Sequence, residues 1–180
     1  MRVIAGNARG RKLQTLEGRD IRPTTDKVKS AIFSSIHFVL PDTNVLDLFA
    51  GSGQLGIEAW SRGAAHVTFV DQSANAIAII QQNIQTVGCT DQCQVHTMEA
   101  LSFLKSNSQK FDIIFLDPPY RQNILQDIIP HLSSAVCDDG LVICEHETEL
   151  IMPETIGNFQ KEKDKKYGHT STTTYRFRRQ

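Results

Sequence analysis

Residues 45–56, VLDLFAGSGQLG in one-letter code, decide the fold of this chain. An apolar run ends in a turn whose three glycines, Gly51, Gly53 and Gly56, spell G-x-G-x-x-G. A strand followed by a glycine-rich turn and a helix lets a ligand approach the backbone, because glycine adds no side chain and tolerates positive φ. The pattern is typical of nucleotide sites, and alone it leaves open which nucleotide is held.

Apolar segments rich in β-branched residues surround this turn and alternate with helical patterns. We expect strands at residues 45–49, 67–70, 95–98, 111–116 and 141–144. Their nearly continuous hydrophobicity suits a parallel sheet buried on both faces. We expect helices at residues 23 to about 39, 73–87 and 124–132, the last interrupted by Pro130. The alternation predicts an α/β fold with a doubly wound, Rossmann-like sheet.

The two ends of the chain differ from this pattern. Residues 2–16 predict a short N-terminal hairpin that turns at residues 7–10. Residues 159–166 and 172–178 are too closely connected for a crossover helix, so we expect an antiparallel pair. A length of 180 residues with 40% hydrophobic content predicts one domain, residues 1–180. Within it, residues 1–22 form the extension and residues 23–180 the core.

Composition excludes several classes of protein. No apolar run approaches the length of a membrane span, and the N-terminus lacks the apolar stretch of a secretory signal, so we expect a cytoplasmic protein without a membrane partner. The four cysteines have no C-x-x-C spacing and the six histidines do not cluster around them. We therefore expect reduced thiols and no metal site.

Charge is unevenly distributed along a chain whose net charge is −1. Residues 1–30 carry eight basic and three acidic side chains, and residues 161–180 carry seven basic and two acidic ones. If the two ends meet in space, they form a basic surface that attracts phosphates. Ordinary solvated termini explain the same counts, and charge alone leaves both interpretations open.

Two aspartates separate the candidate nucleotides. Asp71 lies 20 residues beyond Gly51, at the end of the second strand, where an acidic residue holds the ribose hydroxyls of an adenosine. Asp47 lies four residues before Gly51. A carboxylate there repels a pyrophosphate and favours a ligand with a cationic end, such as S-adenosylmethionine. The long helical segment before the first strand also departs from a nicotinamide domain.

The fourth strand ends in the tetrapeptide Asp117-Pro118-Pro119-Tyr120. A residue before proline is driven toward an extended conformation, and proline has no N–H group. The Asp117 carboxylate and the Pro118 carbonyl could therefore accept both hydrogens of an exocyclic amine on a nucleobase. Tyr120 offers a flat face on which the base can stack. The alternative is an ordinary proline turn with a core tyrosine.

Glu99 follows the third predicted strand. Its carboxylate could accept a hydrogen bond from the amino group of an adenine, or it could cap the following helix. The sequence leaves these two roles open.

These residues resemble class I S-adenosylmethionine-dependent methyltransferases, and among them the bacterial 16S ribosomal RNA guanine-966 N2-methyltransferases. The resemblance extends over nearly the whole chain, from RVIAGNARGRKL and RPTTDKVKSAIFSSI through DLFAGSGQLGIEAWSRGA and FDIIFLDPPY to KKYGHTSTTTYRF. It implies a seven-stranded sheet with an antiparallel last strand, S-adenosylmethionine as the methyl donor, and guanine N2 in small-subunit 16S rRNA as the acceptor. The substrate is expected to be RNA within an assembled or assembling small subunit.

The resemblance also implies roles for individual residues. The predicted cofactor-binding residues are Asp47, Phe49, Gly51, Gly53, Asp71, Glu99 and Ala100. The predicted catalytic residues, at the target base, are Asp117, Pro118 and Tyr120. The predicted RNA-contacting residues are Arg9, Arg11, Lys12, Arg22, Thr24, Thr25, Lys166 and Tyr167. His169 stands where the family commonly has an acidic or amide residue.

The predicted reaction is direct, in-line transfer of the methyl group, in which the enzyme contributes orientation and hydrogen-bond acceptors. No cysteine lies beside DPPY to act as a nucleophile. Two alternatives stay open: an N6-adenine methyltransferase acting on DNA or RNA, and a module that binds RNA without methylating it. Saturable binding of NAD would instead favour the interpretation of the chain as a dehydrogenase.

Overall fold

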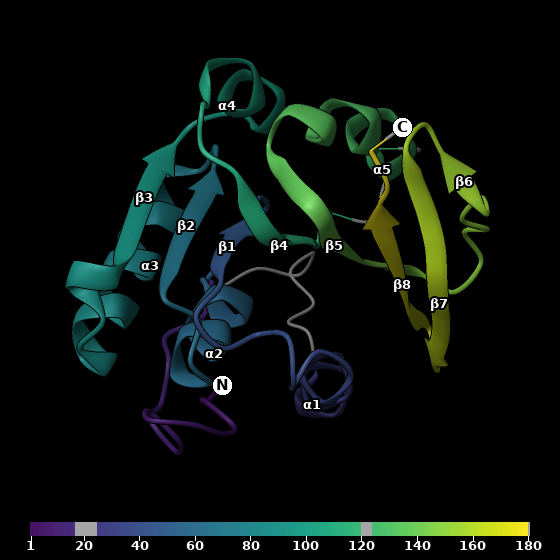
Figure 1. The fold of residues 1–180 in the computed structure, drawn as a ribbon. Helices are drawn as coiled ribbons and strands as arrows, with labels where there is room; N and C mark the ends of the chain where they lie inside the picture. The colour runs from purple at the N-terminus through teal and green to yellow at the C-terminus, as the bar shows by residue number, and fades with distance from the viewer. Residues whose placement is uncertain (17–24, 120–123, 180) are drawn as a thin grey trace.

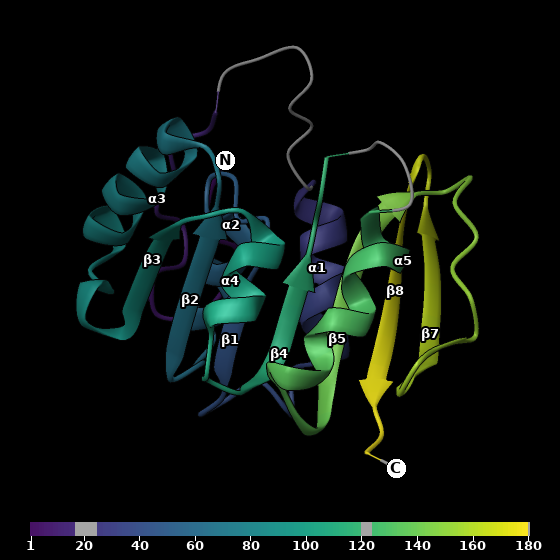
Figure 2. The ribbon, with the colours of Figure 1, turned by 90° about the horizontal axis from the view of Figure 1, so that it is seen from above.

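The computed structural model describes residues 1–16, 25–119 and 124–179. Within them the chain forms one sheet of eight strands in the order β3-β2-β1-β4-β5-β8-β7-β6, with helices on both faces (Figures 1 and 2). The parallel strands are β1 (Asn44–Asp47), β2 (His66–Asp71), β3 (Cys93–Thr97), β4 (Phe111–Leu116) and β5 (Val136–Glu147). The antiparallel pairings involve β6 (Thr155–Ile156), β7 (Phe159–Tyr167) and β8 (Thr170–Phe177).

The helices form two layers that cover the sheet. One layer holds α1 (Asp26–Ser35), α2 (Gln54–Ser61) and α3 (Ala74–Val87), and the other holds α4 (Ala100–Ser106) and α5 (Ile124–Ile128). A 3₁₀ turn, η1 (Thr90–Gln92), precedes β3, and a second, η2 (Ile129–Ser134), continues α5. The predicted α/β fold and all five predicted parallel strands are confirmed. The sheet has one strand more than the resemblance implied, the two-residue β6.

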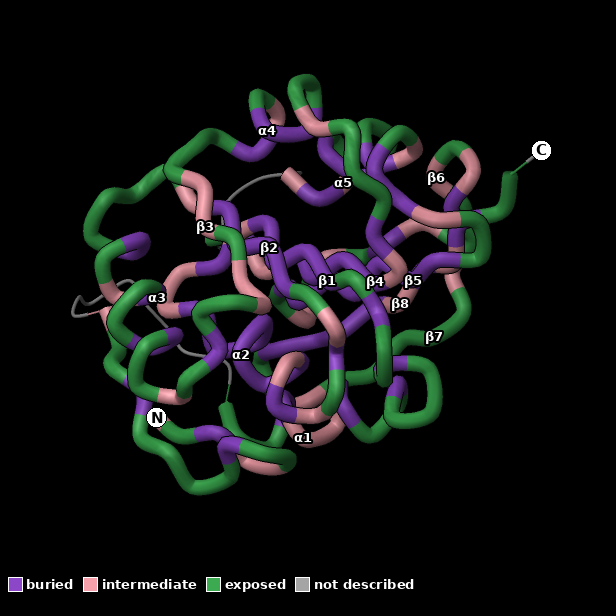
Figure 3. The backbone as a smooth tube through the Cα atoms, turned by 60° about the vertical axis from the view of Figure 1, so that its left-hand side comes forward, coloured by how far each residue is buried: buried purple, intermediate pink, exposed green. Residues whose placement is uncertain are grey.

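Alternation along the strands divides the core into two clusters. In β1, Val45 packs with the α1, α2 and α3 side, whereas Leu46 packs with the α4 and α5 side. Figure 3 shows the buried strands in the middle of the molecule with exposed segments around them. Burial on both faces is what a central parallel strand requires, and it explains why apolar residues follow one another without polar interruption.

The ends of the predicted helices are only partly confirmed. Ser73 caps α3 and Gly88 ends it in the left-handed region, as predicted. Helix α1 begins after its N-cap Thr25 but ends at Ser35, so the predicted extension to Val39 is wrong. The Ser35 hydroxyl donates to the carbonyl of Ile32 at 2.7 Å, and the turn that follows buries Leu40 and leaves Val39 51% exposed.

The N-terminal extension forms a short hairpin around the predicted turn, with an antiparallel bridge between Arg2 and Lys12 and backbone hydrogen bonds from the N–H of Val3 to Arg11 and from the N–H of Gly10 to Val3. Other backbone groups of the extension bond to side chains of the helices. The N–H groups of Ile4 and Ala5 donate to the Glu58 carboxylate at 2.8 and 3.0 Å. The buried Lys29 Nζ donates to the carbonyl of Arg2 at 2.8 Å and lies 3.6 Å from Glu58 Oε2. The extension is thus fastened along α1 and α2.

Candidate active site

A pocket of about 990 Å³ lies at the carboxyl ends of β1, β2 and β4. Strand β1 lies between β2 and β4, so the strand order reverses beside it. The loops that leave these strands go to opposite faces of the sheet, and the gap between them is where open α/β sheets bind ligands. The fold therefore places the glycine turn and the proline turn on two sides of one pocket.

Each glycine of the turn has its own physical reason. Gly51 and Gly53 have φ values of +55° and +77°, a region that other residues rarely adopt. A Cβ on Gly56 would lie 2.3 Å from Cε1 of Phe69 on β2, so only glycine lets α2 pack this closely on the sheet. Gly51 lines the pocket, as predicted. Gly53 does not line it and acts as the N-cap of α2.

Asp47 is buried at the end of β1, with 1% of its surface exposed, and lines the pocket. Its Oδ2 accepts a hydrogen bond from the N–H of Gly56 at 3.0 Å. Burial raises the pKa of Asp47 to about 7, because the apolar surroundings disfavour a carboxylate. A cation in the pocket would compensate that cost, so this residue is suited to a positively charged ligand.

Asp71 organises the rim of the pocket at the end of β2. Its Oδ2 accepts from the N–H of Gly51 at 2.9 Å and its Oδ1 accepts from the N–H of Ser73 at 2.8 Å. Each carboxylate oxygen can accept a further bond, so hydroxyl donors from a ligand can still be accommodated. The geometry is compatible with the predicted contact to a ribose.

Glu99 is the N-cap of α4, and its Oε2 accepts from the N–H of Ser102 at 2.9 Å. Hydrogen bonds from the backbone N–H groups of Leu101 and Ser102 lower the pKa of Glu99, which keeps it ionised. Glu99 and Ala100 also line the pocket, as does the predicted Phe49. The capping role is therefore present, and Glu99 faces the site where an adenine is expected.

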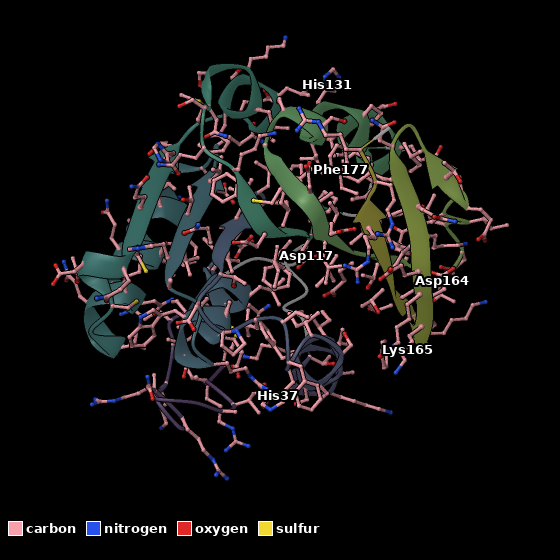
Figure 4. All side chains as sticks on the ribbon, in the orientation of Figure 1. His37, Asp117, His131, Asp164, Lys165 and Phe177 are labelled. Atoms are coloured by element: carbon pink, nitrogen blue, oxygen red, sulfur yellow. The ribbon has the colours of Figure 1, made fainter. Side chains whose placement is uncertain are left out.

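The proline turn forms the opposite wall. Asp117 and Pro118 line the pocket directly after β4, and Figure 4 shows Asp117 at the end of that strand. Pro118 is buried, so the turn is held in place by packing. Tyr120, the third predicted residue at the target base, lies outside the described residues, as do Arg22 and Thr24.

The N-terminal extension supplies a wall that the sequence did not predict. Thr15 and Leu16 line the pocket, and Leu16 lies over the glycine turn. Asn83 on α3 fixes this arrangement with its buried amide. It accepts from the N–H of Gln14 at 2.8 Å and donates to the carbonyls of Gln14 and Ser52 at 3.0 and 2.9 Å. One side chain thus joins the extension to the turn.

The predicted RNA-contacting residues that the structure describes lie in three places. Arg9 belongs to a turn that bonds to Ser61, at the end of α2 far from the pocket, and Arg11 and Lys12 lie on the same extension. None of these three lines the pocket. Lys166 and Tyr167 lie on β7, which runs in the direction of β5, so they reach the carboxyl edge of the sheet. Thr25 caps α1 and does not line the pocket.

Within residues 1–16 and 159–179, the two basic ends of the chain do not form one surface. The extension lies beside α2, the hairpin of β7 and β8 lies at the other end of the sheet, and the termini are far apart in Figures 1 and 2. Several basic side chains of the hairpin are paired, including Arg176 with Glu162 and Arg178 with Asp139. Among the basic residues predicted to contact RNA that the structure describes, Lys166 lies at the carboxyl edge of the sheet.

Two absences follow from the described part of the chain. Residues 1–16, 25–119 and 124–179 contain no group of three or more His, Cys, Asp or Glu side chains arranged to hold a metal ion. In the same residues, no helix has the length and apolar character that crossing a bilayer requires.

Residues 1–176 match the model of the protein family described as Conserved hypothetical protein 95. The chain belongs to this family. It is 37% identical to ribosomal RNA small subunit methyltransferase D of Haemophilus influenzae, over 97% of this chain and 93% of that protein. It is 39% identical to YlbH of Bacillus subtilis, provisionally named an rRNA methyltransferase, over 99% of this chain and 100% of that protein.

The solved structures agree with these sequence relatives. A structure from Escherichia coli, provisionally assigned as the methyltransferase yhhF, superposes with a TM-score of 0.90 at 34% identity and covers 100% of this chain and 99% of its own. The resemblance drawn from the motifs is thereby confirmed at the level of the family.

Proposed function

We propose that this protein transfers a methyl group from S-adenosylmethionine to the exocyclic N2 of a guanine in small-subunit 16S rRNA, of the position-966 type. The observation that carries the proposal is that one pocket brings together a buried carboxylate on β1 and a proline turn on β4. The first suits a cationic cofactor and the second suits an amine on a base. Near-neutral net charge favours a structured ribonucleoprotein over indiscriminate RNA binding.

The residues present fit S-adenosylmethionine. Asp47 offers a buried carboxylate to a cationic group, and Asp71 offers oxygens to ribose hydroxyls. Glu99 and Ala100 line the part of the pocket that the adenine base would occupy. The pocket has a volume of about 990 Å³, which is at the upper end of the range of roughly 300 to 1,000 Å³ for small-molecule sites. It therefore has room for an acceptor base beside the cofactor. When bound, S-adenosylmethionine supplies an electrophilic methyl group on a sulfonium.

The chain's own contribution at the acceptor side is orientation and hydrogen-bond acceptance. The Asp117 carboxylate and the Pro118 carbonyl each accept a hydrogen bond from one N–H of the guanine amine, and they hold the amine nitrogen facing the cofactor. Acceptors fixed in this way stabilise the positive charge that develops on the amine during attack. Orientation of both reactants lowers the activation barrier further, by an amount of the order of several kcal/mol.

The choice of small-subunit rRNA over other polynucleotides comes from the relatives. Two relatives, from Haemophilus influenzae and Escherichia coli, are named ribosomal RNA small subunit methyltransferase D and align with 97% of this chain. Enzymes that methylate adenine N6 also contain DPPY, but the two full-length relatives named above are called small-subunit rRNA methyltransferases. We therefore place guanine N2 ahead of adenine N6, and a methylating enzyme ahead of a binding module.

A knockout tests this function. Ribosomal RNA from a strain lacking the gene is digested to nucleosides and compared with wild-type rRNA by mass spectrometry. We expect N2-methylguanosine to fall by one residue per small subunit and to return when the gene is restored. Loss of N6-methyladenosine in its place would favour the alternative.

A further inference from the structure

Gln54 carries a buried polar atom that the protein leaves unsatisfied. Among the side chains that the structure describes, its Oε1 is the one buried nitrogen or oxygen without a hydrogen-bond partner. The residue is 7% exposed and lines the pocket. Buried polar atoms are hydrogen-bonded in the great majority of cases, and an unmade bond is costly. A ligand that supplies the missing donor would explain why a glutamine lies here.

The position of Gln54 in α2 indicates what kind of ligand that is. Gln54 is the first residue of the helix, and its N-cap Gly53 contributes no side-chain hydrogen bond. Asp47 accepts from the N–H of Gly56, the third residue. The N–H groups of Gln54 and Leu55 have no partner within the helix, and they lie at its positive end.

The wall therefore combines two acceptors with a pair of donors. Gln54 Oε1 and the Asp47 carboxylate can accept from an ammonium group, while the first amides of α2 can donate to a carboxylate. An α-amino acid in its zwitterionic form carries both groups on one carbon. A pyrophosphate carries only acceptors, so two oxygens in this wall would repel it.

We propose that Gln54 recognises the amino-acid end of the cofactor, with Oε1 accepting a hydrogen bond from its α-ammonium group. This inference rests on the proposed function and extends it, because it assigns a residue that determines which adenosine derivatives the pocket prefers. Derivatives that keep the α-amino acid bind with help from Gln54, and derivatives without it do not.

Isothermal titration calorimetry with two ligands tests the assignment on the full chain. S-adenosylhomocysteine carries the amino acid, whereas 5′-methylthioadenosine keeps the adenosine and the thioether and lacks it. Gln54→Met retains the length of the side chain and removes both polar atoms. Gln81→Leu is the matched control, because Gln81 is an exposed glutamine on α3 outside the pocket lining.

We expect Gln54→Met to weaken S-adenosylhomocysteine about tenfold and to change the affinity for 5′-methylthioadenosine less than about twofold. The same variant without ligand should melt a few degrees higher than the wild type, because the unsatisfied oxygen is gone. Gln81→Leu should change neither affinity.

Equal affinities of wild type and Gln54→Met for S-adenosylhomocysteine would overturn the assignment, as would an equal loss for both ligands or a variant that fails to fold. These outcomes differ from a failure of the proposed function. If the wild-type protein binds neither ligand, the proposed cofactor itself is wrong.

Discussion

Asp47 and Asp71 are aspartates at the carboxyl ends of neighbouring strands, yet burial gives them different chemistry. Asp47 is almost fully buried and its pKa is raised to about 7, while Asp71 lies half-buried at the rim and bonds to two backbone N–H groups. Asp47 is suited to compensate a positive charge on a ligand. Asp71 holds the glycine turn in shape and presents oxygens to a neutral hydroxyl.

The raised pKa of Asp47 predicts a pH-dependent effect of Asp47→Asn. Between its ordinary value of 3.8 and about 7 the unfolded chain ionises this group and the folded chain does not, so wild-type stability falls as pH rises through that window. The asparagine stays neutral. Without ligand, the free energy of unfolding of Asp47→Asn minus that of the wild type should therefore increase by up to ~4 kcal/mol between pH 4 and pH 8. Urea denaturation at both values measures this, and a pH-independent difference would contradict the assigned burial effect.

Asp117 should act on turnover and leave the cofactor site intact. It lines the proline-turn wall, apart from the glycine turn. We expect Asp117→Ala to lower the rate of methyl transfer by about 100-fold or more, with affinity for S-adenosylhomocysteine within about threefold of wild type. Asp127→Ala, which removes an exposed carboxylate from the same pocket wall, is the control. Undiminished turnover in Asp117→Ala would exclude the proposed role.

Among the elements, the N-terminal extension contributes to the pocket although it lies outside the sheet. Glu58, Ser61 and Asn83 fasten its backbone to α2 and α3, and Thr15 and Leu16 then form part of the pocket wall. An extension held by so many bonds to buried side chains is part of the folded domain. Loosening it should therefore weaken the binding of a ligand as well as stability.

Two glycines of the extension form a matched pair for testing this. Gly6 and Gly10 have φ values of +82° and +83°, so alanine costs a similar strain at each, about 1–2 kcal/mol. A Cβ at Gly6 would lie 1.6 Å from the carbonyl oxygen of Ser61, whereas one at Gly10 meets nothing within 4 Å. We expect Gly6→Ala alone to expose the extension to limited proteolysis and to weaken S-adenosylhomocysteine. Identical behaviour of the two variants would show that the docking is unimportant.

The strands and the main helices were predictable because their signals are local. Apolar runs marked β1, β2, β4 and β5, while β3 was marked by its place in the alternation of strands and helices, and Ser73 with Gly88 marked both ends of α3. The end of α1 was not predictable, since a serine hydroxyl and the burial of Leu40 overrode the spacing that placed Val39 inward. The hairpin of the extension was predictable from its turn residues, whereas its docking was not, because its partners on α2 lie more than 50 residues away in the sequence.

The candidate site divides along the same line. Asp47, Asp71, Glu99 and Asp117 could be identified because each ends or follows a strand of a recognisable pattern, and all four line the pocket. Gln54 and Asn83 could not, because their importance depends on burial and on contacts distant in sequence. Arg9 lies in a turn that bonds to Ser61 and does not line the pocket, so its contact with RNA stays a prediction.

At the scale of the whole molecule, the hairpin of β7 and β8 extends the sheet beside the pocket edge. Lys166 and Tyr167 end β7 at the same edge as the end of β5, while Arg179 follows β8 at the other end of the hairpin. Figure 4 shows Lys165 on this strand, away from Asp117. We expect this edge to contact the RNA around the target base.

Charge reversal at the two ends of the hairpin tests that contact. Lys166→Glu should slow methylation of small subunits roughly tenfold near 0.15 M salt, and more at lower salt, because it replaces an attraction to phosphate with a repulsion. Affinity for S-adenosylhomocysteine should not change. Arg179→Glu, an exposed reversal at the far end, should leave methylation near the wild-type rate. Equal effects of both variants would point to overall charge instead of a local contact.

The central claim is tested most directly by methyl transfer in vitro. Small subunits from the knockout strain are incubated with the purified protein and S-adenosylmethionine labelled in its methyl group, and the labelled nucleotide is then mapped. We predict one methyl group per subunit, on N2 of a single guanine in 16S rRNA. Label on an adenine, or no label above that of an Asp117→Ala control, would contradict the proposal.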